Sequence, residues 1–315
     1  MSKKFKYSVF SGGIIFLILI NFIAYNHAYQ FTHFTNSPQS HTRITSLAPS
    51  EKLKVLFNGF ENSRPKNRSS PSQNYQTIHI QGYAELEAWY CQVENPLGIV
   101  IMFHGYRGKK SRMINKAEEI LKMGYNTLLV DFYGSGGSEG NSTSIGFHEA
   151  KDVIASYQYI QNHAAGIPVF LFGTSMGSAA ILKAMESSDL QADGLILECP
   201  FGTLRQAVQN RFELTGVPSF ILSDLLLFWG SVQNDFWAFD HNPEEYAAHV
   251  AIPTLMIYGE KDDKVKREET DAVFENLSGK KELLLLPNSG HTRFLRNHRE
   301  EWKKSVGDFL KRNSQ

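Results

Sequence analysis

Several kinds of residue that would identify a protein class are scarce in this sequence. It has two cysteines, Cys91 and Cys199, among 315 residues, which is too few for a disulfide framework. Both lie in or beside apolar runs, and we expect them to be buried free thiols. No cysteine lies near the N-terminus, so a lipid-anchored lipoprotein is not expected. Histidine, cysteine and carboxylate residues form no cluster with metal-ligand spacing, so the sequence predicts no metal site.

An excess of charge of either sign is also missing. Lys and Arg together number 32, and so do Asp and Glu. With this balance, and with no basic run after the N-terminus, nucleic acid is not the expected partner. The length suits one large α/β domain or two small ones, with enough chain to bury a sizeable core.

The N-terminal region lacks charge for an unusually long stretch, positions 8–41. An apolar run, Val9–Tyr25, would just cross a hydrocarbon core of roughly 30 Å as a helix. Three basic residues precede it: Lys3, Lys4 and Lys6. Four aromatic residues at the end of this run and just after it resemble an interfacial belt: Tyr25, Tyr29, Phe31 and Phe34.

Two other interpretations of this region are weaker. A cleaved signal peptide would need small residues one and three positions before the cut, but Ala28 follows Asn26 and His27. A buried core helix fits badly, because the segment stands apart from the rest of the sequence. We therefore expect an uncleaved membrane anchor over 1–35. Its lysines would stay in the cytoplasm, with the remaining chain on the outer side.

The sequence then divides into a spacer, 36–74, and an α/β domain, 75–315. The spacer is rich in Ser, Pro, Asn and Thr and contains one predicted helix, Glu51–Phe57, with Ser50 as N-cap and Gly59 as its end. The domain begins with a predicted hairpin, Thr77–Ile80 and Leu86–Cys91. Short apolar runs typical of buried parallel strands follow: Ile99–Phe103, Thr127–Val130, Val169–Phe172, Leu195–Leu197, Thr254–Tyr258 and Glu282–Leu286.

Helical patterns alternate with these runs and indicate a doubly wound α/β sheet. The predicted helices are Ser111–Met123, Phe147–Asn162, Met176–Ser187, Glu268–Leu277 and Arg299–Lys311. Residues 202–250 interrupt the alternation with an aromatic, helical stretch. The simplest interpretation is a helical cap over the strand ends that forms the substrate pocket; a second core beside the sheet is the alternative.

The central motif is Gly173–Gly177, which reads G-T-S-M-G between a predicted strand and a predicted helix. This G-x-S-x-G pattern in a strand–turn–helix context is typical of a nucleophile elbow. We expect Ser175 to occupy a strained backbone conformation, with glycine needed at Gly173 and Gly177 because a Cβ would crowd the turn.

A nucleophilic serine needs a base, and the base needs an acid to orient it. Asp262 and His291 each follow the carboxyl end of a predicted strand downstream of Ser175, in the expected order Ser, Asp, His. Asp263 is a close rival for the acid and Glu198 a weaker one. Other histidines are less well placed: His241, His249 and His298.

A loop for stabilising an oxyanion is also present. The strand Ile99–Phe103 leads into His104 and Gly105, and Gly105 would let the backbone amide of Tyr106 face the developing charge. The amide of Met176 would be the second donor. We interpret His104 as a structural residue whose ring holds the loop.

Residues Asp131–Gly140 are rich in glycine and serine but do not form a phosphate loop. A G-x-G-x-x-G pattern would need glycine at position 139, which is Glu139, and no Gly-Lys-Ser or Gly-Lys-Thr follows. We expect a chain of turns beside the site.

Together these motifs resemble the α/β-hydrolase superfamily, in its serine-aminopeptidase-like and monoacylglycerol-lipase-like branch. The resembling segments are His104–Gly108, Asp131–Gly140, Gly173–Gly177, Gly259–Val265 and Gly290–His291. The resemblance implies an eight-stranded, mostly parallel sheet with helices on both faces and a helical lid. It also implies an acyl-enzyme mechanism that uses no cofactor. The N-terminal layout looks like that of membrane-anchored bacterial members.

The resemblance leaves the substrate open. The aromatic cap favours an esterase or lipase acting on a small acyl substrate, with an aminopeptidase-like enzyme as the alternative. An aminopeptidase would need acidic residues to hold a free amine, and five are available: Glu198, Glu213, Asp224, Asp235 and Asp240. A non-catalytic binding or adhesion protein is less expected, because such proteins usually lose a triad residue.

Overall fold

The computed structural model describes residues 3–36, 48–164, 166–215 and 220–314. Its centre is an eight-stranded sheet with the strand order β10-β9-β8-β7-β5-β6-β4-β3. The strands are β3 Tyr75–Gln81, β4 Glu85–Cys91, β5 Ile99–Phe103, β6 Asn126–Val130, β7 Val169–Thr174, β8 Gly194–Glu198, β9 Thr254–Gly259 and β10 Lys281–Leu286. Within this sheet as described, β3 with β4 and β4 with β6 pair antiparallel, and the other strand pairs are parallel. The predicted hairpin and the six predicted apolar strands are confirmed.

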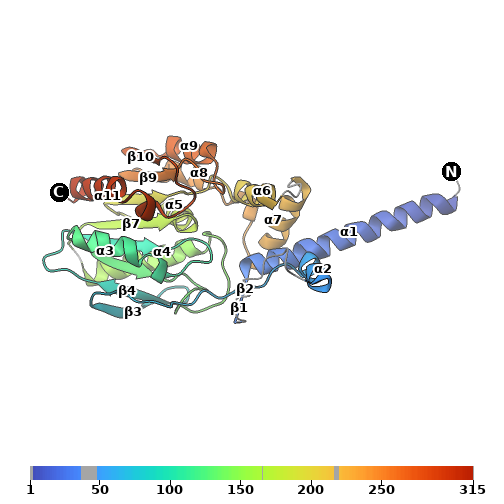
Figure 1. Cartoon of the computed structure of the whole chain (residues 1–315), viewed down its shortest axis with the longest axis horizontal. Coiled ribbons are helices and arrows are strands. Elements are labelled where there is room, and N and C mark those ends of the chain that lie inside the picture. The colour runs from blue at the N-terminus through green and yellow to red at the C-terminus, as the bar shows by residue number, and fades with distance from the viewer. Residues whose placement is uncertain (1–2, 37–47, 165, 216–219, 315) are drawn as a thin grey trace.

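Helices cover both faces of the sheet, as Figure 1 shows. They are α3 Ile114–Lys122, α4 Glu149–His163, α5 Met176–Ser187, α9 Arg267–Asn276 and α11 Arg299–Asn313. The side chains of β5 alternate between two cores: Ile101 packs on the face covered by α4 and α5, and Met102 on the face covered by α3 and α11. This alternation is why the central strands are apolar on both faces.

Two predicted helix starts are corrected. The segment expected to be helical from Ser111 begins with a 3₁₀ turn, η2 (Lys110–Arg112), and α3 starts only at Ile114. In the N-terminal region, α2 spans Pro49–Asn58, and its N-cap is Ala48 rather than Ser50. The Glu51 carboxylate accepts a 2.9 Å hydrogen bond from the Ala48 amide, which is one of the two bonds of a capping box.

The regular secondary structure that is described between β8 and β9 is helical. It contains α6 Leu204–Thr215, α7 Phe220–Asn234, η3 Ala238–Asp240, α8 Pro243–Tyr246 and η4 Ala247–His249. In Figure 1, α6 and α7 lie between the sheet and the N-terminal helix. A short helix, α10 (Phe294–Asn297), precedes α11.

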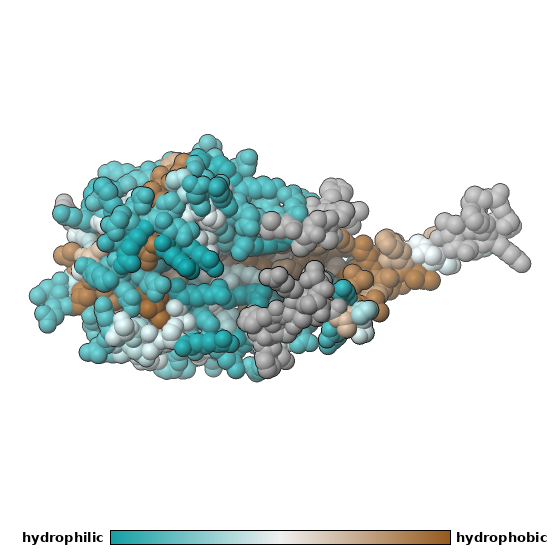
Figure 2. All heavy atoms as spheres, in the orientation of Figure 1, coloured by the Kyte–Doolittle hydropathy of each residue, from teal (hydrophilic) through white to brown (hydrophobic). Residues whose placement is uncertain are grey.

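The N-terminal helix α1, Lys3–Thr32, projects from the body (Figure 1) and carries exposed apolar residues along much of its length (Figure 2). Its part Phe10–Thr32 is long and apolar enough to cross a membrane. The helix continues seven residues beyond the predicted apolar run and ends against the body, followed by β1 (Phe34–Thr35), which pairs with β2 (Asn62–Ser63).

The expectation that this segment stands apart is wrong for its C-terminal half. The Trp229 indole on α7 donates a 3.1 Å hydrogen bond to the Asn21 side chain. The Tyr25 ring packs edge-on against Trp229 with centroids 5.3 Å apart, and Gln233 donates to the Tyr25 carbonyl at 2.8 Å. Tyr25 therefore contacts the helices after β8 instead of serving only as an interfacial residue. Apolar sequence alone could not reveal this docking, because the same composition suits lipid and protein contacts.

Candidate active site

The turn between β7 and α5 has the strained geometry expected of an elbow. Ser175 has φ 55° and ψ −114°, a conformation that L-residues rarely adopt. A Cβ on Gly173 would lie 2.5 Å from the amide nitrogen of Ser178. A Cβ on Gly177 would lie 2.5 Å from the carbonyl oxygen of Phe103. Glycine is therefore required on both sides of Ser175.

Three predicted residues from distant parts of the chain meet at this turn. His291 Nε2 lies 2.9 Å from Ser175 Oγ, and His291 Nδ1 lies 2.8 Å from Asp262 Oδ2. The other oxygen of Asp262 accepts hydrogen bonds from the amides of Lys264 at 2.8 Å and Val265 at 3.1 Å. The Asp262 carboxylate is fully buried. Its fixed position orients the imidazole toward the serine.

The rival acids lie elsewhere. Asp263 is exposed beside Asp262. Glu198 is buried at the end of β8, where it forms an ion pair with Lys116. It also accepts hydrogen bonds from Thr174 Oγ1 at 2.8 Å and from the Trp302 indole at 3.0 Å. Glu198 therefore stabilises the end of β7 next to the elbow instead of contacting His291. Its partner Lys116 could not be identified from the sequence.

The other histidines are not brought to Ser175. His241 is buried, and burial lowers its pKa to about 4. Its Nε2 lies 3.1 Å from the Ile145 carbonyl oxygen, so it serves packing. His249 is exposed, and His298, which precedes α11, lies 3.9 Å from Glu301 in the first turn of that helix.

The loop after β5 lies directly against the elbow. A Cβ on Gly105 would be 3.1 Å from the Thr174 carbonyl oxygen and 3.5 Å from the Ser175 Cβ. This close approach brings the backbone that follows Gly105, including Tyr106, next to the start of α5 at Met176. The arrangement suits a pair of backbone amides that face one developing charge.

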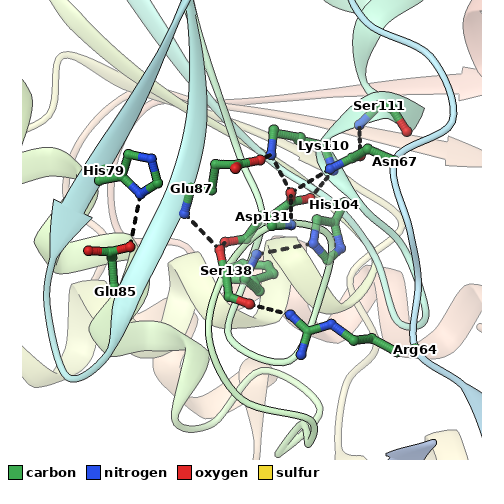
Figure 3. Close-up of polar contacts among 12 residues, drawn as sticks. Arg64, Asn67, His79, Glu85, Glu87, His104, Lys110, Ser111, Asp131 and Ser138 are labelled. Atoms are coloured by element: carbon green, nitrogen blue, oxygen red, sulfur yellow. Dashed lines mark hydrogen bonds and ion pairs between the residues drawn. The ribbon is translucent and has the colours of Figure 1, made fainter. Parts of the chain in front are cut away.

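His104 holds this loop, as Figure 3 shows. Its Nε2 accepts a 3.2 Å hydrogen bond from the Phe132 amide, so Nδ1 carries the proton and donates to the Gly105 carbonyl at 2.9 Å. Burial lowers the pKa of His104 below its ordinary value, which favours this neutral form. The observed contacts agree with the predicted structural role of His104.

A buried ion pair lies beside the same loop (Figure 3). Lys110 is fully buried and contacts both Asp131 and Glu87. Burial acts to raise the pKa of Asp131, but Lys110 and further hydrogen bonds outweigh it and lower the pKa. Asn67 donates to the same carboxylate at 2.7 Å. The turns of Asp131–Gly140 are confirmed, and they carry a structural charge network that the pattern did not reveal.

Within the described residues, one group brings possible metal-ligand atoms together: Cys199, Asp262 and His291, within 4.8 Å of one another. Burial raises the pKa of the Cys199 thiol well above its ordinary value. Its Sγ lies 2.9 Å from the His291 carbonyl oxygen, to which the thiol donates. A metal would need the thiolate, so the geometry favours the hydrogen-bonded arrangement. Both cysteines are buried free thiols, as expected.

Ser175 and His291 open onto a cleft of 1640 Å³. Phe31, in the last turn of α1, also lines it, so the N-terminal helix reaches the site. None of the acidic residues considered for amine binding is among its described lining residues: Glu198, Glu213, Asp224, Asp235 and Asp240. The prominence of Lys and Arg in the cleft could not be predicted, because these residues come from separate segments.

Comparisons with known proteins agree with the architecture. The serine aminopeptidase S33 family matches residues 94–244, and the PhoPQ-activated pathogenicity-related protein family matches residues 238–315. A solved esterase of Pyrococcus furiosus superposes with a TM-score of 0.66 at 23% identity, covering 79% of this chain and 96% of the esterase. The chain therefore has the α/β-hydrolase fold, and the resemblance found in the motifs is confirmed.

Two curated relatives extend the comparison. The uncharacterised protein YqkD of Bacillus subtilis is 26% identical over 73% of this chain and 76% of YqkD. The lysophosphatidylserine lipase ABHD12 of Danio rerio is 23% identical over 79% of this chain and 62% of ABHD12. The chain thus spans less than two thirds of the zebrafish lipase. These similarities support an α/β-hydrolase enzyme with esterase- or lipase-like relatives.

Proposed function

We propose that this α/β-hydrolase is a serine hydrolase that cleaves carboxylic esters through an acyl-enzyme. The observation that carries the proposal is the continuous hydrogen-bonded series Ser175–His291–Asp262, with both contacts between 2.8 and 2.9 Å. These distances suit a nucleophile, a general base and an orienting acid.

The reaction follows from this geometry. Because Nδ1 of His291 faces a carboxylate, that nitrogen carries the proton and Nε2 accepts the proton of Ser175. Ser175 Oγ attacks the acyl carbonyl, and Asp262 stabilises the imidazolium that forms. The amides of Tyr106 and Met176 hold the oxyanion. His291 then gives its proton to the departing alkoxide. Water, activated by the same histidine, releases the acyl group.

The charge of the cleft favours esters over aminopeptidase substrates. A free amine would need carboxylates near Ser175, whereas the only acidic residues among the described lining are Glu118 and Glu119. Glu119 is already paired with Lys122 and Arg299. The names of the Pyrococcus esterase and the zebrafish lipase agree with this preference.

The N-terminal helix would anchor this activity to a membrane. We assign 1–35 to the anchor, 36–74 to the connecting segment and 75–315 to the catalytic domain, with 202–250 as its cap. Lys3, Lys4 and Lys6 would retain the N-terminus in the cytoplasm and place the catalytic domain outside. A reporter enzyme fused after residue 315 tests this orientation; a reporter that works only in the cytoplasm contradicts it.

A fluorophosphonate probe tests the enzymatic assignment. The full-length protein should be labelled at Ser175, and Ser175→Ala should not. Ser178→Ala is a matched control, because Ser178 is a buried serine three residues away that donates to the Glu198 carbonyl. Equal labelling of the wild type and Ser175→Ala would contradict the proposal.

A further inference from the structure

The cleft at Ser175 has a strongly one-sided charge. Thirteen of its described lining residues are Lys or Arg, and two are Glu. The whole chain has equal numbers of basic and acidic residues, so the excess is local. A cleft lined by one sign of charge attracts ligands of the opposite sign. We call this region, including the wall formed by Arg107, Arg112 and Arg211, the cationic cleft.

Among the described residues, these three arginines have no side chain of opposite charge within ion-pair distance. In the part of the chain that the structure describes, the guanidinium groups of Arg107, Arg112 and Arg211 make no ion pair or side-chain hydrogen bond. Residues 37–47, 165 and 216–219, which lie outside the described ranges, include no Asp or Glu. Elsewhere in the cleft, Lys116 and Arg299 have carboxylate partners. The three arginines are therefore available to a ligand.

Arg107 and Arg112 repel each other, and Arg112 and Arg211 are partly removed from water. Burial lowers the pKa of Arg112, and the neighbouring charge of Arg107 lowers it further. Burial is also the largest cause that lowers the pKa of Arg211, and the charges of Asp262, Asp263 and Glu269 offset only part of it. Charges held together and partly removed from water are stabilised by a counter-charge. Guanidinium groups match carboxylate and phosphate oxygens in bidentate geometry.

The cluster lies beside the reacting atoms. Arg107 directly follows Tyr106, whose loop contacts the elbow through Gly105. Arg107 and Arg211 both act electrostatically on the Tyr106 side chain, so both lie near it. Arg211 comes from α6 and Arg107 from the loop after β5, so the cap and the sheet each supply a cation. An anion held there would be part of a substrate whose ester reaches Ser175.

We propose that the cationic cleft binds the anionic group of the substrate, so that the enzyme prefers acyl esters whose alcohol portion carries a phosphate or a carboxylate. This inference rests on the proposed hydrolase function and specifies its substrate class. Phe31 at the end of α1 lines the same cleft, so the cleft adjoins the helix that we propose as the membrane anchor.

Matched substrates test the preference. The full-length protein in neutral detergent micelles is assayed with 1-acylglycerol, its 3-phosphate and its 3-hemisuccinate, all with the same acyl chain. The proposal predicts kcat/KM at least about tenfold higher for one or both anionic esters than for the neutral ester, mainly through KM. The better anionic ester identifies the recognised group. The same three headgroups on acetyl esters distinguish a soluble source from a lipid source.

Single substitutions test whether the arginines of the cationic cleft cause the preference for anionic esters. Arg211→Gln and Arg112→Gln should lower kcat/KM for the preferred anionic ester about tenfold more than for the neutral ester. Arg205→Gln is the matched control on α6: Arg205 is exposed, pairs with Asp224 and does not line the cleft. It should leave the ratio of anionic to neutral activity unchanged.

The outcomes separate the two proposals. If the probe labels Ser175 but the neutral ester is hydrolysed as well as both anionic esters, anion recognition is wrong and the hydrolase function stands. An anionic preference that Arg112→Gln and Arg211→Gln leave intact also overturns the assignment to this cleft. If Ser175 is not labelled, the hydrolase function fails. Anionic 1-acylglycerol 3-phosphate should then still bind Ser175→Ala more tightly than 1-acylglycerol does.

Discussion

The phenolic hydroxyl of Tyr106 donates a 2.6 Å hydrogen bond to the carbonyl oxygen of Phe31. Phe31 lies in the last turn of α1, where carbonyl groups lack partners within the helix. The two rings also stack, with centroids 6.4 Å apart. The N-terminal helix is therefore bonded to the residue whose amide we propose as an oxyanion donor.

Tyr106→Phe should weaken this junction and keep the backbone amide. Loss of one hydrogen bond is expected to lower the free energy of unfolding by about 1 kcal/mol. Ester hydrolysis should fall severalfold, because the loop loses its tie to α1. Urea unfolding and steady-state kinetics measure the two effects. Tyr83→Phe, at an exposed position, is the control. A Tyr106→Phe protein identical to the wild type would show that the contact has no role.

Two glycine-to-alanine substitutions should change the stability of the protein in opposite directions. In Gly177→Ala the new Cβ would meet the Phe103 carbonyl oxygen at 2.5 Å, so we expect activity to be lost and stability to fall by about 1–3 kcal/mol or more. Gly307→Ala on α11 meets only Met123 Sδ at 3.6 Å and should gain roughly 0.5–1 kcal/mol. Thermal unfolding of both variants tests this contrast. An active Gly177→Ala enzyme would contradict the tight packing of the elbow.

Removing the buried Lys110 cation beside the oxyanion loop should destabilise the protein. Lys110→Met leaves Asp131 and Glu87 without their shared partner, and we expect a loss of about 3–5 kcal/mol in the free energy of unfolding. Lys304→Met breaks an exposed pair with Asp308 and should change stability little. Denaturant titration compares them. Equal effects would mean that the network contributes no more than a surface pair.

Asp152 gives the stability of the protein a distinct pH dependence. Burial raises its pKa from 3.8 to about 8, so between these values the folded state holds a proton that the unfolded state has released. The contribution of this group therefore weakens as pH rises through that window. Asp152→Asn can still accept the 2.9 Å hydrogen bond from the Tyr133 amide. It should be more stable than the wild type at pH 8, with the difference shrinking toward pH 4.

Unfolding measured at several pH values tests this expectation. The control is Asp189→Asn, at an exposed position. A difference between Asp152→Asn and the wild type that stays constant from pH 4 to pH 8 would contradict the assignment.

The parts of the fold and site that could be predicted are those governed by local sequence. The apolar run before Gly173 and the glycines around Ser175 specify the elbow within nine residues, and strand ends before Asp262 and His291 bring them to the same edge of a parallel sheet. Asp262 could be preferred to Asp263 only on motif spacing, because adjacent residues differ in the direction of their side chains.

Features built from distant segments could not be predicted. The contact between Asn21 and Trp229 joins residues 208 positions apart, and nothing in either local pattern specifies it. Arg107 and Arg211 likewise approach Tyr106 from a loop and from α6. In the sequence, each of these arginines looks like an ordinary surface residue. The excess of positive charge in the cleft becomes visible only in the folded structure.

The central claim is that Ser175 forms a covalent acyl-enzyme. Rapid acid quenching of the full-length protein with an ester substrate, followed by mass spectrometry of its peptides, tests it most directly. We expect the peptide containing Ser175 to gain the mass of the acyl group less one hydrogen, and Ser175→Ala to show no such species. Ester hydrolysis with no acylated peptide, or acylation that persists in Ser175→Ala, would contradict it.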